Sequence, residues 1–239
     1  MLVLCQFLER SNLETEIHFA GVKKMTTNEF DGQFNNNNIS VDESLIGKMN
    51  CNYISIKRFF DIVLALILFI PSAIIIFAFG ILVKLESKGP MLYSQQRVGI
   101  NGKYFMIFKL RSMYDNADMI GPLYTAESDN RITKVGKIIR KLRIDELPQL
   151  RNILRGEMSF IGPRPLTGYE YDISNVDFNQ RLLVLPGISG LAQVSGGNNH
   201  TNEQKLECDL NYIKNISMKL DFKILCKTIV VIFSGNGAR

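Results

Sequence analysis

The chain has 239 residues, of which 46% are hydrophobic, so it can bury the core of one domain of ordinary size plus appendages. Its net charge of +5 indicates an anionic partner, such as nucleic acid, a phosphate-bearing ligand or an anionic membrane surface. Two histidines, and four cysteines without a CxxC spacing, argue against a histidine-based triad, a histidine-rich metal site and a zinc or redox motif. Free thiols in a reducing, cytosolic compartment are the expected state.

Residues 1–55 differ from the rest of the chain because they are polar and contain the run QFNNNNIS. This composition, without steady periodicity, predicts a flexible N-terminal extension. The apolar run in MLVLCQFLER is too short for a signal peptide and lacks a basic region before it.

The most apolar part of the chain lies within residues 56–88. No charge occurs from Ile62 to Val83, which is longer than the roughly 20 residues that a helix needs to cross a bilayer. Pro71 and Ser72 fall near the middle, where proline removes a backbone hydrogen bond and serine can satisfy a freed group. Cations, which favour the cytoplasmic side, flank both ends of the run. These features favour a re-entrant helix and a spanning helix equally. A buried helix of a soluble protein is the third interpretation and the least favoured.

Residues 89–115 predict two short strands, because β-type runs flank INGK, which carries an Asn-Gly turn signal. Lys109 and Arg111 alternate with Phe108 and Leu110. Both cations would therefore lie on one face of the second strand. A solvated outer face is the plain alternative.

The segment RITKVGKIIRKLRIDELPQLRNILR, residues 131–155, carries eight cations against two anions. Its first part predicts a basic amphipathic helix, a form that suits an anionic membrane surface. Pro148 disfavours helix at Leu147 and suits the first turn of a new helix. Asp145 and Glu146 would therefore lie at a junction between two helices. Surface salt bridging is the alternative for such a pair.

Two stretches rich in glycine and proline follow, GEMSFIGPRP and LPGISGLAQVSGGNN, and both predict loops with ordered turns. Residues 204–235 return to helical spacing. Within them ILCKTIVVIF is too short to span a membrane and contains a lysine, so it predicts a core or interfacial helix.

The motifs KRFFD…KGP, QQRVG…FKLRSM, DELPQ…GPRP, PGISGLAQVSG and DLNYIKNISMKLDFKILCKTI follow one another in this chain. In this order they resemble the bacterial sugar transferase family, the monotopic polyprenyl-phosphate phosphoglycosyl transferases, over about residues 57–235. The resemblance implies transfer of a sugar-1-phosphate from a UDP-sugar to a polyprenyl phosphate such as undecaprenyl phosphate. UMP would be released, and the product would begin a capsule, exopolysaccharide or other glycan.

The same resemblance implies roles for the acidic pair. Asp145 would be the nucleophile that forms a covalent aspartyl-phosphosugar intermediate, and Glu146 would hold Mg²⁺ (or Mn²⁺) together with Asp145. A carboxylate suits this role, because it is a good leaving group when the acyl phosphate reacts onward. A metal and nearby cations would neutralise the approaching anions.

Four cations would bind substrate phosphates by the same resemblance: Lys109, Arg111, Arg140 and Arg164. Arginine is well shaped for bidentate phosphate contacts, while a structural salt bridge is the alternative for each residue. The PGISGLAQV loop would help to form the nucleotide side of the site. Lys57 and Arg58 would either attract the lipid phosphate or serve only as topology signals.

The family's broken membrane helix favours a re-entrant helix at residues 56–88, with the break at Pro71 and Ser72. A cytosolic catalytic domain at residues 89–239 would lie on the surface of the bacterial inner membrane. The expected fold is α/β, of the α+β and helix-rich kind, with interfacial amphipathic helices. The expected partners are the UDP-sugar donor, the polyprenyl phosphate acceptor, the bilayer and downstream glycosyltransferases, without nucleic acid.

Two departures from the family pattern stand out. The family usually has arginine where this chain has Gly197, in VSGGNN, which leaves the nucleotide or sugar preference open. The helix break commonly reads Ser-Pro, whereas here it reads Pro71-Ser72. Two other functional classes are possible. One is a membrane-tethered nucleic-acid-binding protein, but the sequence contains no recognised nucleic-acid-binding motif. The other is a non-catalytic scaffold of a glycan assembly complex, and the acidic pair argues against it.

Overall fold

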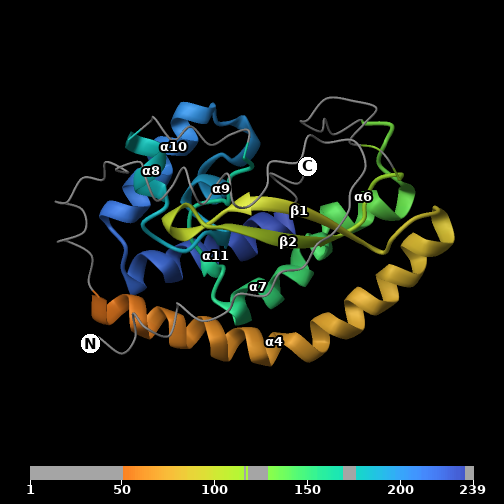
Figure 1. The fold of residues 1–239 in the computed structure, drawn as a ribbon, viewed down its shortest axis with the longest axis horizontal. Coiled ribbons are helices and arrows are strands. Elements are labelled where there is room, and N and C mark those ends of the chain that lie inside the picture. The colour runs from red at the N-terminus through yellow and green to blue at the C-terminus, as the bar shows by residue number, and fades with distance from the viewer. Residues whose placement is uncertain (1–50, 116, 118–128, 169–175, 235–239) are drawn as a thin grey trace. The chain divides into compact units, whose positions relative to one another are not determined.

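The computed structural model describes residues 51–115, 117, 129–168 and 176–234 (Figure 1). All of them belong to one unit that spans Ile39–Arg239. The predicted extension at residues 1–55 lies outside the described residues as far as residue 50.

The apolar run forms one helix, α4 (Cys51–Glu86), which begins earlier than the predicted residue 56. Among the described residues it is the one helix long and apolar enough to cross a membrane. The helix is continuous through Pro71, so the predicted break at Pro71 and Ser72 does not interrupt it. Figure 1 shows α4 bending near its middle, and proline commonly causes such a bend without ending the helix.

The predicted hairpin is confirmed. Strands β1 (Leu92–Val98) and β2 (Tyr104–Leu110) pair antiparallel along their whole length. They are joined through a short 3₁₀ turn, η1 (Ile100–Gly102). Asn101 and Gly102 have φ angles of 54° and 73°, in the left-handed region that asparagine and glycine tolerate best.

The acidic pair lies between two helices, as predicted. Helix α6 (Lys134–Lys141) ends before a 3₁₀ helix, η2 (Ile144–Gln149), and α7 (Leu150–Arg155) follows directly. Arg143 makes the turn between α6 and η2 with a φ of 57°. Pro148 lies inside η2, where the missing N–H and fixed φ suit a short tight turn before α7.

The prediction that both Gly- and Pro-rich stretches are loops is wrong in part. Each contributes a three-residue strand, β3 (Ser159–Ile161) and β4 (Gly187–Ser189), and the two pair in parallel. A Cβ on Gly187 would lie 2.2 Å from the backbone nitrogen of Gly162. The glycines therefore allow the close approach, while strands this short carry no periodic signal in the sequence.

The helical spacing predicted over residues 204–235 is confirmed as far as residue 234 by the last two helices of the C-terminal part, whereas the three short helical elements before them were not predicted. The elements of this part are α8 (Val176–Arg181), α9 (Leu191–Ser195), η3 (Gly197–Asn199), α10 (Asn202–Lys214) and α11 (Met218–Ser234). Figure 1 shows these helices gathered at the turn end of the hairpin and α6 at the other end, with α4 and α7 along one side. The described residues thus form a helix-rich fold with two small two-stranded sheets.

Both halves of α4 pack on the same unit. Ala65 belongs to a core cluster with residues of β2 and α7, and Val83 belongs to a cluster with Leu110 and Ile139. Near its start, Arg58 donates a 2.6 Å hydrogen bond to the carbonyl oxygen of Ile153 at the end of α7. At its last residue, the Glu86 carboxylate accepts hydrogen bonds from the first backbone N–H groups of α6. The helix is therefore held at both ends.

A second anchor joins the start of α4 to α11. The Asp221 carboxylate accepts a 2.5 Å hydrogen bond from the Tyr53 hydroxyl and a 2.8 Å bond from the Tyr212 hydroxyl. The Lys57 ammonium lies 2.6 Å from the same carboxylate. Lys57 and Arg58 thus both contact other parts of the protein, while attraction of a lipid phosphate stays a prediction.

We predict that Asp221→Ala lowers the melting temperature by about 5 to 15 °C, because it leaves a half-buried lysine and two hydroxyls without their acceptor. The measurement is thermal unfolding followed by circular dichroism, since the chain has no tryptophan. Glu207→Ala, which removes an exposed acid from α10, is the control and should change the melting temperature little. Equal melting temperatures for both variants would contradict the anchoring role.

Candidate active site

The acidic pair is buried against strand β2. The side chains of Asp145 and Glu146 are 13% and 11% exposed. The Nζ atom of Lys109, from β2, lies 3.3 Å from Oε1 of Glu146 and 3.8 Å from Oδ2 of Asp145. One lysine therefore lies within ion-pair distance of both carboxylates, and the structure brings these three predicted residues together.

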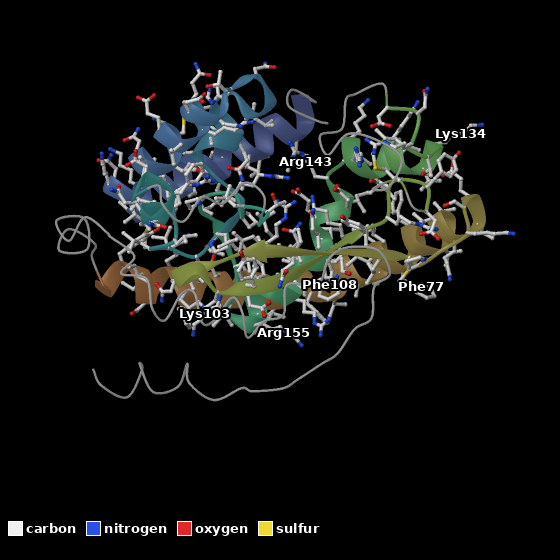
Figure 2. All side chains as sticks on the ribbon, turned by 45° about the horizontal axis from the view of Figure 1, so that its top comes forward. Phe77, Lys103, Phe108, Lys134, Arg143 and Arg155 are labelled. Atoms are coloured by element: carbon white, nitrogen blue, oxygen red, sulfur yellow. The ribbon has the colours of Figure 1, made fainter. Side chains whose placement is uncertain are left out.

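Two arginines complete the ring of charge around Glu146. Arg143 places Nη1 4.0 Å from Oε2, and Arg164, from the GPRP loop after β3, places Nη1 3.8 Å from Oε1. The left-handed turn at Arg143 directs its side chain back toward the acid three residues later. In Figure 2, Arg143 lies between α6 and the C-terminal helices, while Phe77 and Lys103 lie toward opposite ends.

The two carboxyl groups differ in their electrostatic surroundings. Burial, followed by repulsion from Glu146, raises the pKa of Asp145 to about 6, although Lys109, Arg140 and Arg143 act in the opposite direction. Burial alone would also raise the pKa of Glu146, but its neighbouring cations, Lys109 first among them, hold that pKa below its ordinary value. Glu146 is thus the fixed anion of the pair, and Asp145 is the carboxyl group that is less well compensated.

The pair offers a partial metal site. The Oδ1 atom of Asp145 is buried and accepts no hydrogen bond from the residues that the structure describes. Within the same part of the chain, no cluster of three or more acidic, histidine or cysteine side chains is present. Mg²⁺ commonly binds one or two carboxylates, with waters and substrate phosphates as its other ligands. The two carboxylates therefore fit a Mg²⁺ ion that is shared with a phosphate substrate.

Arg140 and Arg111 occupy different surroundings. The Nε atom of Arg140 donates a 2.7 Å hydrogen bond to the Ser112 hydroxyl, and its charge lowers the pKa of Asp145. Arg111 instead donates to the carbonyl oxygens of Ser87 and Lys88, just after α4. Arg111 lies one residue beyond the end of β2. Its side chain binds the chain just after α4 and does not join Lys109 at the acidic pair.

Arg97 also contributes to the site, although nothing in the QQRVG motif predicted a role for it. Its Nη1 donates a 3.1 Å hydrogen bond to the carbonyl oxygen of Pro165. The next residue, Val98, donates its backbone N–H to the carbonyl oxygen of Leu166. Strand β1 therefore fixes the GPRP loop, which carries Arg164 to the acidic pair. A lone arginine in an alternating strand gave no signal for this contact.

A pocket opens beside the acidic pair. Its lining comes from β1, β2, η2, the GPRP loop and β4: Arg97, Ile107, Lys109, Glu146, Gln149, Arg164, Pro165, Gly187 and Ile188. The PGISG segment thus reaches the site, as predicted, while its role toward a nucleotide stays a prediction. Gly197 has a φ of 55°, and a Cβ built on it would meet no atom within 4 Å.

The chain is similar to sugar transferases. A family model described as "Bacterial sugar transferase" matches residues 52–235. A UDP-N-acetylgalactosamine-undecaprenyl-phosphate N-acetylgalactosaminephosphotransferase of Aeromonas hydrophila is 45% identical over 78% of this chain and 46% of its own length. The uncharacterized sugar transferase EpsL of Bacillus subtilis is 41% identical, over 76% and 89%. A UDP-glucose:undecaprenyl-phosphate glucose-1-phosphate transferase of Caulobacter vibrioides is 38% identical, over 76% and 71%. The chain spans less than half of the Aeromonas relative.

We predict opposite stability effects for the two acids. Because the folded-state pKa of Asp145 is raised, its ionisation costs stability as pH rises from about 4 to 6. Asp145→Asn should therefore increase the free energy of unfolding at pH 7.5, by up to about 3 kcal/mol, and so raise the melting temperature. At pH 4 both quantities should change much less. The measurement is thermal unfolding at both pH values.

Glu146→Gln is the matched variant. The pKa of Glu146 in the wild type is lowered in the folded state, so ionised Glu146 contributes stability at neutral pH that is lost on acidification. This variant should lower the melting temperature at pH 7.5. A lower melting temperature for Asp145→Asn at pH 7.5 would contradict the assignment of the weakly compensated carboxyl group.

Proposed function

The chain belongs to the bacterial sugar transferase family, and from this premise we propose that it transfers a sugar-1-phosphate from a UDP-sugar to undecaprenyl phosphate or a related polyprenyl phosphate. The names of two relatives, those of Aeromonas hydrophila and Caulobacter vibrioides, support both substrates, because each joins a UDP-sugar to undecaprenyl phosphate. The product would be a polyprenyl diphosphate sugar that begins a capsule, exopolysaccharide or other glycan. The particular sugar is left to experiment.

One observation carries the proposed mechanism: a buried, weakly compensated carboxylate lies beside a carboxylate held by three cations. Asp145 has an oxygen without a hydrogen-bond donor among the described residues. Glu146 is surrounded by Lys109, Arg143 and Arg164. A nucleophile must be free to attack, whereas a positioning anion must stay in place. The two environments match these two tasks.

The reaction takes place in two displacements at one phosphorus. An Asp145 carboxylate oxygen forms a bond to the sugar-bearing phosphorus, and the bond from that phosphorus to the bridging oxygen of UMP breaks. The resulting acyl phosphate holds the sugar phosphate on Asp145. An oxygen of the polyprenyl phosphate then attacks the same phosphorus, and the Asp145 carboxylate leaves with its electron pair restored. Each step replaces one P–O bond by another, so no redox partner is needed.

The cations and a metal ion have separate roles in this proposal. Glu146 and the second oxygen of Asp145 would hold Mg²⁺, which supplies charge neutralisation on the phosphate oxygens. Lys109 and Arg164 would turn from Glu146 to the phosphates of the donor, and Arg140 would stabilise charge near Asp145. Arg111 is left out of this set, because its contacts are with carbonyl oxygens at the end of α4.

We place the enzyme at the cytosolic face of the bacterial inner membrane, with α4 re-entrant. Apolar side chains on α4, such as Phe59, Ile70 and Phe77, are 63%, 69% and 66% exposed, which suits a lipid environment. Both ends of α4 contact the same unit, through Arg58 on α7 and Glu86 on α6. Downstream glycosyltransferases would take up the product.

We predict that the detergent-solubilised chain, given Mg²⁺, undecaprenyl phosphate and a panel of UDP-sugars, releases UMP from one of them. Asp145→Asn should lower the rate by about a thousandfold or more, because it removes the nucleophile. EDTA should stop the release, and added Mg²⁺ should restore it. Without lipid, the wild type should release at most about one UMP per enzyme, as a covalent intermediate requires.

The control for this assay is Glu207→Gln, an exposed acid on α10, which should keep the wild-type rate. Lipid-dependent UMP release that survives Asp145→Asn would overturn the role of Asp145. No UMP from any UDP-sugar, in a folded and membrane-inserted sample, would favour the non-catalytic scaffold.

We predict that both ends of α4 face the cytosol. The test places single cysteines at Ile54 and Lys88, which are exposed, in a chain whose own cysteines are replaced by serine. A membrane-impermeant maleimide should label both positions in inverted membrane vesicles and neither in spheroplasts. Labelling of one position from each side would instead establish a spanning helix.

A further inference from the structure

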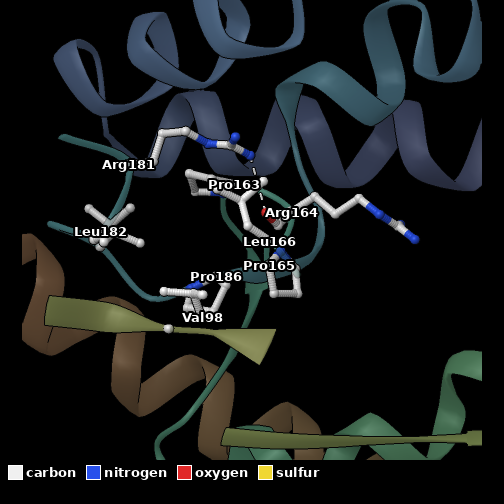
Figure 3. A pocket seen from close by; sticks show the side chains of 10 residues that line it. Val98, Pro163, Arg164, Pro165, Leu166, Arg181, Leu182 and Pro186 are labelled. Carbon is white, nitrogen blue, oxygen red and sulfur yellow. Dashed lines mark hydrogen bonds between the residues drawn. The ribbon is translucent and has the colours of Figure 1, made fainter. Parts of the chain in front are cut away.

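A buried arginine stands behind the GPRP loop. Arg181, the last residue of α8, has 7% of its side chain exposed, and its Nη2 lies 2.7 Å from Oδ2 of Asp209, which is 1% exposed. The same Nη2 donates a 3.2 Å hydrogen bond to the carbonyl oxygen of Arg164 (Figure 3). The Phe178 ring, 5.9 Å from the guanidinium carbon, packs against it. One nitrogen thus links α10 to the loop.

The loop is held by arginines at two successive carbonyl groups. Arg181 binds the carbonyl oxygen of Arg164, and Arg97 binds that of Pro165. Figure 3 shows the Arg164 side chain pointing away from Arg181 and from the apolar residues around it. The Arg164 side chain is 32% exposed, and its Nη1 lies 3.8 Å from Oε1 of Glu146. The backbone of Arg164 is therefore fixed from behind, while its charged end projects to the acidic pair.

Stability alone does not explain a buried ion pair at this place. Burying two charges costs about as much as their attraction returns, and apolar residues of similar volume often serve as well. Burial raises the pKa of Asp209 to about 6, with the charge of Arg181 acting in the opposite direction. What the pair adds beyond packing is a guanidinium fixed in direction, which an apolar pair lacks.

We propose that Asp209 and Arg181 form a positioning pair, which sets Arg164 for the diphosphate of the nucleotide donor. This inference rests on the proposed function, since it takes Arg164 as a phosphate ligand. Neither Asp209 nor Arg181 touches the substrate; both act through the carbonyl oxygen of Arg164. The pair therefore governs donor binding from outside the site.

The test compares stability with nucleotide binding. UDP serves as the probe, and its affinity in the presence of Mg²⁺ is measured by calorimetry beside the melting temperature. Asp209→Asn should weaken UDP binding and raise the donor KM, each by about tenfold, within the range for coupling between contacting residues. The kcat should change much less. Glu207→Gln, on the same helix, should leave both values unchanged.

A double variant separates positioning from packing. Arg181→Met with Asp209→Leu replaces both charges by apolar groups and should recover most of the stability lost in Asp209→Asn. If the pair positions Arg164, UDP binding should stay about tenfold weaker despite the recovered melting temperature. Recovery of both values together would overturn the inference, because the pair would then be needed only for folding.

Arg181→Lys keeps the charge and gives a test even if the variants of Asp209 do not fold. In the wild-type background it should weaken UDP binding, because the shorter single-nitrogen head cannot hold both partners in the same geometry. In an Arg164→Ala background it should have no further effect, since its action passes through Arg164. The same fold-change in both backgrounds would overturn the inference.

The inference and the proposed function fail in different ways. If the wild type releases UMP but the binding effects are independent of Arg164, the transferase stands and the positioning role falls. If the wild type releases no UMP, the transferase proposal fails, and the UDP cycle still decides whether the pair acts through Arg164. Absence of UDP binding by the wild type would overturn the positioning role directly.

Discussion

The buried ion cluster at Glu146 is the interaction on which the rest of this site depends. A carboxylate taken out of water is costly unless charges and hydrogen bonds replace the lost solvation. Lys109, Arg143 and Arg164 supply those charges, and each comes from a different element. Glu146 therefore joins strand β2, the turn after α6 and the GPRP loop at one point. Asp145, next to it, shares the burial but receives less compensation.

This arrangement leaves the Asp145 carboxyl group, the nucleophile in the proposed function, largely shielded from bulk water. The cations that stabilise Glu146 are also the groups that anionic substrates need, so an incoming diphosphate would compete with Glu146 for them. A metal ion between the pair and the substrate would offset that loss of contacts. In the proposed function the site would exchange one anion for another, and the net charge of +5 would favour such anionic substrates.

The long apolar helix belongs to the same construction. Near its start it is held by Arg58 and by the contacts of Tyr53 and Lys57 with Asp221. At its end it is held by Glu86 and Arg111. Because these contacts reach α6, α7 and the hairpin, α4 supports the elements that carry the acidic pair. The carboxylates and arginines at its two ends thus contact other elements of the fold, whereas the cations around Glu146 come from elsewhere in the chain.

The sequence by itself determined the elements with strong local signals. The uncharged run predicted a long helix and the Asn-Gly signal predicted the hairpin turn, because backbone geometry and periodicity are encoded in neighbouring residues. The break predicted at Pro71 and Ser72 does not interrupt α4, and Pro148 lies inside η2 instead of in the first turn of the next helix. The motifs also pointed to Asp145 and Glu146. Only the tertiary structure decided the partners: it separated Arg111 from Lys109, paired β3 with β4, and brought Arg97 and Arg181 to the GPRP loop. Such contacts join residues far apart in the chain, so neither spacing nor composition could reveal them.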